Sequence, residues 1–293
     1  MIAIELILVF VLAYLIGSIN MAIIISKVSG KGDIREQGSK NAGTTNVLRV
    51  LGKGPAILVL LWDVLKGALA IGIARGLAYI CFPMEAGSLV YSETFTMAYT
   101  YGIMLATVGA VLGHNFPIYF GFKGGKGVAT SLGCILAIEP QIGLVCLVAG
   151  VSMIALFNMV SIGSIIAAII YPICIIFMGG TFDLNFRTNA YIKLIYIIFA
   201  FLMALSVILR HKANIKRIRN GTENKLFKSK EEKFEEELKK ENEIKEKVEE
   251  VKEEAKEEVK EEIKEEVKDE EVDIKFEPVK EEVKEEKSKK KSK

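Results

Sequence analysis

The segment VATSLGCILAIEPQIGLVCLVAGVSMIALF, from Val128 to Phe157, decides the fold because its interpretation fixes how often the chain crosses a membrane. Its only charged residue is Glu139, which Pro140 follows. Proline removes a helical hydrogen bond and disfavours helical backbone at the residue before it. We therefore predict two helices that meet at Glu139 and Pro140. Two full spans need about 20 apolar residues each, so one of these helices must be short, tilted or re-entrant.

Other long apolar segments surround this one in a chain of 293 residues, of which 51% are hydrophobic. Such segments are long enough to cross a bilayer as helices. They are Ile2–Ser26, Pro55–Phe82, Thr94–Gly113, Ser161–Met178 and Ala190–Leu209. With Val128–Phe157 counted as a pair, the sequence predicts an all-α polytopic integral membrane protein with about seven transmembrane helices, some of them short. Five spans is the alternative.

The positions of Lys and Arg predict the orientation of the spans, because basic residues favour the cytoplasmic side of short loops. They collect at Lys27–Lys53, at Lys123 and Lys126, and at Arg210–Lys228. Seven spans bring all three groups to one side, with the N-terminus outside and the C-terminus inside. Six spans would leave the last group outside.

The charge divides the chain into a membrane-embedded domain, residues 1–228, and a tail, residues 229–293. The tail has 19 Lys and 27 acidic residues, whereas the preceding part has 19 basic and 9 acidic residues. The repeat VKEEAKEEVKEEIKEEV, from Val251 to Val267, combines helix formers with like charges four residues apart. We predict a fluctuating helix or a disordered segment and assign it no catalytic role and no particular partner.

Three polar segments lie between or after the apolar ones, and the predicted topology places them on the same side. They are GSKNAGTTNVLR (Gly38–Arg49), GHNFPIYFGFKGGKGVAT (Gly113–Thr130) and RHKANIKRIRNGTE (Arg210–Glu223). Glycines can turn successive backbone N–H groups towards one anion, and Ser, Thr, Asn, Lys and Arg add further donors. The segments therefore indicate a phosphate or carboxylate site, with plain linkers as the alternative.

The sequence GGKG, from Gly124 to Gly127, differs from a nucleotide-binding P-loop because no Ser or Thr follows the lysine. It leads into a predicted helix at Val128, and a helix N-terminus after a glycine loop favours anions. The two histidines, His114 and His211, each lie where a span meets a polar segment. No metal site is predicted, because no second histidine or carboxylate has ligand spacing.

Together the three segments resemble the signature regions of the bacterial acyl-phosphate:glycerol-3-phosphate acyltransferases, the PlsY family, over roughly Ile2 to Lys228. The resemblance implies transfer of a fatty acyl group from acyl phosphate to the 1-hydroxyl of sn-glycerol 3-phosphate, giving lysophosphatidic acid and inorganic phosphate without a cofactor. It implies a multi-pass protein of the bacterial cytoplasmic membrane whose active site faces the cytoplasm. The expected partners are both substrates and membrane lipid, and no nucleic acid.

The resemblance also assigns roles to residues of the three segments. The positions associated with catalysis are Ser39, Arg49, His211 and Asn214, and Glu223 is expected to be structural. The resemblance further assigns Gly124, Gly125 and Gly127 to the glycerol-phosphate site. From their hydrogen-bonding and charged groups we expect further substrate contacts at Asn41, Gly43, Thr44, Asn46, His114, Lys123 and Lys126. Two candidates remain for the acceptor of the hydroxyl proton, namely His211 and an oxygen of the acyl phosphate itself.

A membrane transporter for a phosphorylated metabolite is the alternative function, because its anion site would also combine glycines with basic residues. Asp63 and Lys66 support this alternative, since charged groups inside a span are often functional. They are three residues apart on one helical face, however, so they can equally form a structural pair.

Overall fold

The computed structural model describes residues 1–83, 92–178 and 190–227, together with residues 238, 241, 242, 244–249, 251–253, 255 and 256. The chain forms two compact units, Met1–Phe227 and Lys228–Lys293. The described residues are helical or irregular and include no strand. The all-α prediction is therefore confirmed.

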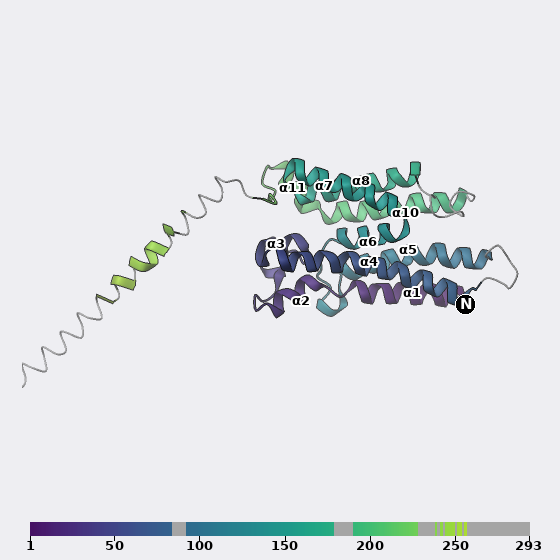
Figure 1. Cartoon of the computed structure of the whole chain (residues 1–293), viewed down its shortest axis with the longest axis horizontal. Helices are drawn as coiled ribbons and strands as arrows, with labels where there is room; N and C mark the ends of the chain where they lie inside the picture. Colours follow the sequence, from purple (N-terminus) through teal and green to yellow (C-terminus); the bar gives the residue numbers. More distant parts are fainter. Residues whose placement is uncertain are drawn as a thin grey trace, which may run out of the picture. The chain divides into compact units, whose positions relative to one another are not determined.

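The first unit is a bundle of long helices (Figure 1). The long helices are α1 (Ile2–Gly17), α4 (Lys53–Cys81), α5 (Glu93–Asn115), α7 (Pro140–Phe157), α8 (Val160–Met178) and α10 (Ala190–Arg210). The shorter ones are α2 (Met21–Val28), η1 (Ile34–Glu36), α3 (Thr44–Leu51), η2 (Ile118–Phe120), α6 (Val128–Ile138) and α11 (Lys212–Arg219). Within the described residues, six helical segments are long and apolar enough to cross a membrane, and α6 is a shorter apolar helix.

The predicted break inside Val128–Phe157 is confirmed. Helix α6 ends at Ile138, and α7 begins at Pro140, which occupies the first helical position. Proline suits this position because its fixed φ is helical and the first N–H of a helix has no internal partner. Helix α6 has only 11 residues, so it is the short member that the sequence predicted.

The first apolar segment differs from the prediction, because it contains two helices instead of one. Helix α1 ends at Gly17, and α2 begins at Met21. Asn20 separates them: its backbone is extended, and its side-chain oxygen accepts a hydrogen bond from the N–H of Ile23 at 3.2 Å. Asparagine is a favoured N-cap because its side chain satisfies a free amide of the first turn. Hydropathy alone did not reveal this cap.

Glycines bring α6 close to α4, and this packing holds the start of α6 in place. A Cβ at Gly67 would overlap the carbonyl oxygen of Thr130, and one at Gly133 would overlap that of Val64. Small residues at such crossings let helix backbones approach closely inside a membrane, where packing drives association. Helix α5 packs on α1 in a similar way, through Gly109 against Phe10.

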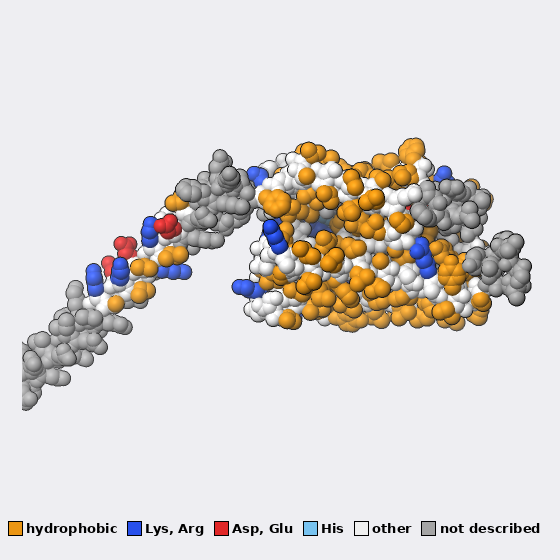
Figure 2. Space-filling view, in the orientation of Figure 1, with side chains coloured by type: hydrophobic (Ala, Val, Ile, Leu, Met, Phe, Trp, Pro, Cys, Tyr) orange, Lys and Arg blue, Asp and Glu red, His pale blue; other side chains and the backbone are white. Residues whose placement is uncertain are grey.

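The helices form two groups that meet around α6 (Figure 1). Helices α1, α4 and α5 pack together, and α6 packs mainly on α4 and α7. Helix α8 packs on α7 and α10. Apolar side chains cover most of the visible face of this unit, as a lipid-facing surface requires (Figure 2). The bundle is thus a multi-pass membrane domain.

Little of the tail is described, and that part is helical. Lys245 Nζ lies 3.2 Å from Glu241 Oε1, one turn earlier, and both side chains are exposed. Such a pair stabilises a helix by only about 0.2–0.5 kcal/mol. Most of the predicted repeat, Val251–Val267, lies outside the described residues.

Candidate active site

The three signature segments lie at one end of the membrane bundle, where α3 and α11 are found (Figure 1). The predicted meeting of these segments therefore agrees with the fold. Residues 38–49 comprise a short loop and most of α3. Residues 116–127 connect α5 to α6, and residues 210–223 contain α11. We call these segments the first loop, the second loop and the third segment.

Asn46 organises the first loop. Its side-chain oxygen accepts a hydrogen bond from the N–H of Ser39 at 2.8 Å, and its Nδ2 donates to the carbonyls of Ile34 and Gln37, both at 3.0 Å. Gly38 has a φ of +54°, and a Cβ there would overlap Asn46 Oδ1. The Asn46 amide is thus engaged in shaping the loop around Ser39, although we expected it to contact substrate.

The glycines of the second loop allow close packing against the end of α5. The N–H groups of Gly124 and Gly125 donate to the carbonyls of Asn115 and His114, both at 3.1 Å. A Cβ at Gly125 would overlap the His114 ring and would lie 2.7 Å from the carbonyl oxygen of Ala42 in the first loop. Both amides are therefore occupied by carbonyls of α5, and contact of these glycines with substrate stays a prediction.

Helix α6 starts directly after the second loop, as predicted. Gly127 is its N-cap, with a φ of +77°, a left-handed conformation that favours glycine. The first amides of a helix have no partner within the helix, and they attract anions. The hydroxyls of Thr130 and Ser131 are also buried without a hydrogen-bond partner in the described part of the chain. The start of α6 therefore offers free donors.

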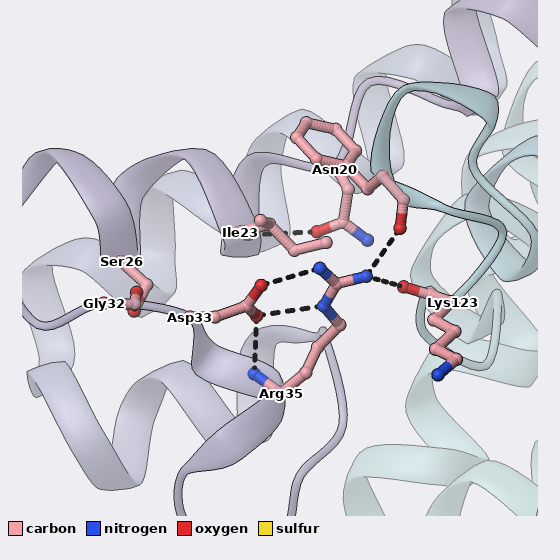
Figure 3. Close-up of polar contacts among 8 residues, drawn as sticks. Asn20, Ile23, Ser26, Gly32, Asp33, Arg35 and Lys123 are labelled. Atoms are coloured by element: carbon pink, nitrogen blue, oxygen red, sulfur yellow. Dashed lines mark hydrogen bonds and ion pairs between the residues drawn. The ribbon is translucent and has the colours of Figure 1, made fainter.

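An ion pair just before the first loop, which was not predicted from the sequence, is bonded to the second loop (Figure 3). Asp33 binds the Arg35 guanidinium through Nε at 2.9 Å and Nη2 at 2.6 Å, and Arg35 Nη1 donates to the carbonyls of Phe120 (2.6 Å) and Lys123 (3.0 Å). The hydrogen bond from Arg35 lowers the pKa of Asp33 to about 2, so the pair is charged at neutral pH. We call Asp33 and Arg35 the loop clamp. Its only sequence signal is two opposite charges, two residues apart, just before the first loop.

Glu223 is the centre of a hydrogen-bond network in the third segment. Its carboxylate accepts from Asn214 Nδ2 at 2.6 Å, from Ser161 Oγ at 2.8 Å and from Arg217 Nε at 2.7 Å. Burial raises the pKa of Glu223, but these hydrogen bonds outweigh burial and hold the pKa below its usual value. The network fixes α11 to the start of α8. Ser161 had not been singled out from the sequence.

Positive charge from all three segments collects around this carboxylate. Arg49, Lys126 and Arg217 act on this carboxylate, and Arg210 acts on Lys126. Lys126 Nζ donates to Asn214 Oδ1 at 2.6 Å, which links the second loop to the third segment. Burial lowers the pKa of Lys126 to about 8; Glu223 opposes this shift and the arginines add to it. The four cations together carry more charge than Glu223 neutralises, so they favour the binding of a further anion.

Arg210 supports this interpretation with a free donor. Its Nη2 donates to the carbonyl of Asn115 at 2.7 Å, and its guanidinium lies over the Phe116 ring, 4.5 Å from the centroid. Its Nε is buried and has no hydrogen-bond partner among the described residues. An unpaired buried donor on a cation is costly unless a ligand or water satisfies it. We call these four cations with Glu223 the cationic cluster.

His211 lies beside the cationic cluster and is neutral at physiological pH. Its Nδ1 lies 2.8 Å from the carbonyl oxygen of Val207, which can only accept, so Nδ1 holds the proton. Burial, together with the charge of Lys126, lowers the pKa of His211 to about 4. Its Nε2 is consequently an acceptor and a weak base. This environment does not favour His211 as a general base at neutral pH.

His114 forms a buried cluster with Asp63 and Lys66 next to the second loop. Asp63 Oδ1 lies 2.7 Å from Lys66 Nζ and 3.3 Å from His114 Nδ1, and Lys66 Nζ lies 2.9 Å from the same His114 nitrogen. All three side chains are almost fully buried. Asp63 and Lys66 therefore form the structural pair that the sequence allowed, which removes an argument for transport. The buried His114 ring packs against Gly125 and so supports the second loop.

The other predicted residues lie around the first and second loops. Ser39, Arg49 and Lys123 are exposed, and the Lys123 side chain points away from Arg35 (Figure 3). Gly43 is the N-cap of α3, and the buried Thr44 hydroxyl has no partner within the described residues. Asn41 packs next to Gly43. The fold thus brings the predicted residues to one end but separates the exposed ones from the supporting ones.

An apolar cavity of about 150 Å³ opens next to the cationic cluster. It lies between α5, α6, α7, α8 and α10. Val128, which follows Gly127, and Val207, which bonds to His211, line its near end. The site therefore combines a cationic surface with an apolar cavity, and the two meet where α6 begins.

Comparison with known proteins identifies relatives over nearly the whole membrane domain. The sequence model of the family described as glycerol-3-phosphate acyltransferase matches residues 7–221. A protein of Clostridioides difficile named glycerol-3-phosphate acyltransferase is 41% identical over 225 residues, which cover 77% of this chain and 97% of the relative. A protein of the same name from Thermoanaerobacter pseudethanolicus is 39% identical, with coverage of 76% and 96%.

Two solved structures share the fold. Both are crystal structures of PlsY, an integral membrane glycerol 3-phosphate acyltransferase, one in the glycerol 3-phosphate form and one in the lysophosphatidic acid form. The TM-scores are 0.59 and 0.56, and the sequence identity is 31%. Each alignment covers 75% of this chain and 94% of the known structure.

Proposed function

The chain belongs to the glycerol-3-phosphate acyltransferase family, and we propose that it transfers a fatty acyl group from acyl phosphate to the 1-hydroxyl of sn-glycerol 3-phosphate. The products are lysophosphatidic acid and inorganic phosphate. The observation that carries the proposal is the cationic cluster at the mouth of an apolar cavity. Both substrates and the leaving group contain phosphate, and only the donor has a long apolar chain.

The cationic cluster accounts for the phosphates. Arg49, Lys126 and the free Nε of Arg210 would hold phosphate oxygens, since hydrogen bonds between charged groups are shorter and stronger than neutral ones. Glu223 holds Asn214, and Asn214 in turn holds Lys126. We therefore assign Asn214 and Glu223 to positioning Lys126, while Ser39 on the exposed first loop would donate its hydroxyl to the acyl phosphate.

The reaction needs no covalent enzyme intermediate. The glycerol hydroxyl oxygen attacks the acyl carbonyl carbon, the new ester bond forms, and the bond from this carbon to the phosphate oxygen breaks. The hydroxyl proton passes to an oxygen of the departing phosphate. Neutral His211 suits an orienting role, because its free Nε2 can accept a hydrogen bond from the 2-hydroxyl of glycerol 3-phosphate, which leaves the proton of the attacking 1-hydroxyl to the phosphate oxygen. Donors aimed at the developing oxyanion each contribute about 3 kcal/mol in comparable sites.

We also place the protein in the cytoplasmic membrane of a bacterium, with the cationic end facing the cytoplasm. Basic residues at that end favour this orientation. Glycerol 3-phosphate would reach the site from the aqueous side, and the acyl chain would enter the cavity from the lipid. This geometry explains why polar loops and an apolar cavity meet at one end of the bundle.

The test is product formation by the full chain, purified in detergent or lipid, from radiolabelled glycerol 3-phosphate and palmitoyl phosphate. Palmitoyl-CoA serves as the competing donor. Ser39→Ala should abolish product, whereas the matched control Ser29→Ala, at the exposed serine that follows α2, should not. Product from palmitoyl-CoA alone would refute the proposed donor. Absence of product with either donor, from protein that elutes as one species, would refute the proposed reaction.

A further inference from the structure

The apolar cavity has a defined near end and a defined far end. Its near end lies at the cationic cluster, where Val207 accepts hydrogen bonds from both the backbone N–H and Nδ1 of His211. Helices α7 and α8 run antiparallel from the turn at Asn158, so Ile154 and Gly163 line the near end, and Cys146 and Tyr171 line the far end. The cavity thus extends away from the cluster along α8.

Small residues line most of the α8 wall, and one large residue ends it. The lining positions are Gly163, Ser164, Ala167, Ala168 and Tyr171, which share one helical face. From Gly163 to Tyr171 the helix rises about 12 Å at 1.5 Å per residue. Tyr171 is only 7% exposed, so its ring is packed in place.

The cavity also contains, close to its near end, a serine hydroxyl that makes no hydrogen bond to the described residues. Ser131, in the first turn of α6, lines the cavity and is 9% exposed. Its hydroxyl has no hydrogen-bond partner among the described residues. A buried hydroxyl without a partner is costly, and a ligand carbonyl at this depth would satisfy it. The cavity therefore suits a ligand with a polar end at the cationic cluster and an apolar chain that extends beyond Ser131.

We propose that Tyr171 closes this cavity and sets the length of the acyl chain that the protein transfers. The inference rests on the proposed function and adds the determinant of donor specificity. Each methylene group buried in the cavity favours binding by about fourfold. Methylene groups that would reach beyond Ala167 and Ala168 meet the Tyr171 ring. They gain nothing further unless the ring moves, and moving it disturbs a close-packed core.

The test compares acyl phosphates of increasing length, from decanoyl to stearoyl phosphate, with glycerol 3-phosphate saturating. Ala167→Phe fills the middle of the cavity and should lower kcat/KM at least about tenfold for the longest good donor, since it displaces two or more methylene groups. The optimum should move to shorter donors. Tyr171→Ala removes the barrier and should move the optimum to longer donors. Ile169→Phe, on the outer face of α8 where Ile169 is 42% exposed, is the matched control and should keep the wild-type profile.

The failure of this inference and the failure of the proposed function would give different results. If wild-type protein uses acyl phosphates but Ala167→Phe and Ile169→Phe have the same chain-length profile as the wild type, the cavity does not measure the chain and this inference is overturned. If the wild type uses no acyl phosphate of any length, the proposed function fails. Ala167→Phe remains informative if Tyr171→Ala is too unstable to purify, because it changes the cavity from the opposite direction.

Discussion

Lys126 should make the reaction rate fall at alkaline pH, because its pKa lies only slightly above neutral pH. We call this fall the alkaline limit. Burial lowers this pKa to about 8. Only the ammonium form attracts phosphate, so kcat/KM for glycerol 3-phosphate should fall as pH rises through about 8. Protonated and neutral Lys126 are present at about ten to one at pH 7 and about one to ten at pH 9. The second pKa of a phosphate monoester is about 6, which places substrate ionisation well below this limit.

The size of the effect follows from the hydrogen bond that Lys126 can make. A hydrogen bond to a charged group contributes about 1.5–3 kcal/mol, which corresponds to about 10- to 150-fold in kcat/KM. Lys126→Met keeps the apolar stem and removes the charge, so kcat/KM at pH 7 should fall by this factor and lose its alkaline limit. Lys126→Arg keeps its charge at every accessible pH and should also lack the limit.

The assay measures initial rates of radiolabelled lysophosphatidic acid formation from pH 6 to pH 10, with varied glycerol 3-phosphate. The profile of kcat should be limited at a higher pH than that of kcat/KM, because bound phosphate favours the charged lysine. Lys123→Met is the control, since Lys123 is in the same loop but exposed. A Lys126→Met variant that retains the wild-type alkaline limit, or a Lys123→Met variant that is equally impaired, would refute the reasoning.

Other residues of the site lead to three further expectations. Arg35→Ala removes the bonds to two carbonyls of the second loop, so kcat should fall at least about tenfold while Tm falls by only a few degrees; wild-type kcat in this variant would exclude a positioning role. Lowering the pH from 6.5 to 4 should destabilise the wild type more than His211→Gln, as followed by thermal unfolding, because the folded pKa of His211 is about 4 and the ordinary value is 6.5. Between these two pH values the unfolded chain binds a proton at His211 that the folded protein does not bind, so the contribution of neutral His211 to the free energy of unfolding is complete above pH 6.5 and is lost as pH falls. The same pH dependence in both proteins would contradict this expectation. Gly125→Ala should inactivate the enzyme, because its Cβ would overlap the His114 ring, whereas Gly54→Ala has open space in α4 and should remain active in the same assay; equal activities would show that the second loop can shift.

Local sequence signals predicted the helices and the position of the site. The break at Pro140 and the start of α6 after Gly127 follow from the covalent properties of proline and glycine, which act within a few residues. The polar segments were recognisable because hydrogen-bonding residues are expensive in lipid and must lie at the ends of spans. The Asn20 cap was missed, since an asparagine at the end of an apolar run has no periodicity that distinguishes it.

The roles of individual side chains depended on contacts between distant residues. Asn46 was expected to contact substrate, but it bonds to the loop around Ser39, and the Gly124 and Gly125 amides bond to the end of α5. Arg35 could not be assigned because its partners are carbonyls of the second loop, 85 and 88 residues later. No side-chain pattern identifies a backbone acceptor.

The sequence by itself determined that this is a multi-pass helical membrane protein with its three polar segments at one end, because hydrophobicity and glycine or proline geometry act locally. Only the tertiary structure decided which cations lie near Glu223, which nitrogen of His211 carries the proton, and that Tyr171 lines an apolar cavity. These features depend on distances of a few ångströms between helices, and helix packing sets such distances through many small contacts at once.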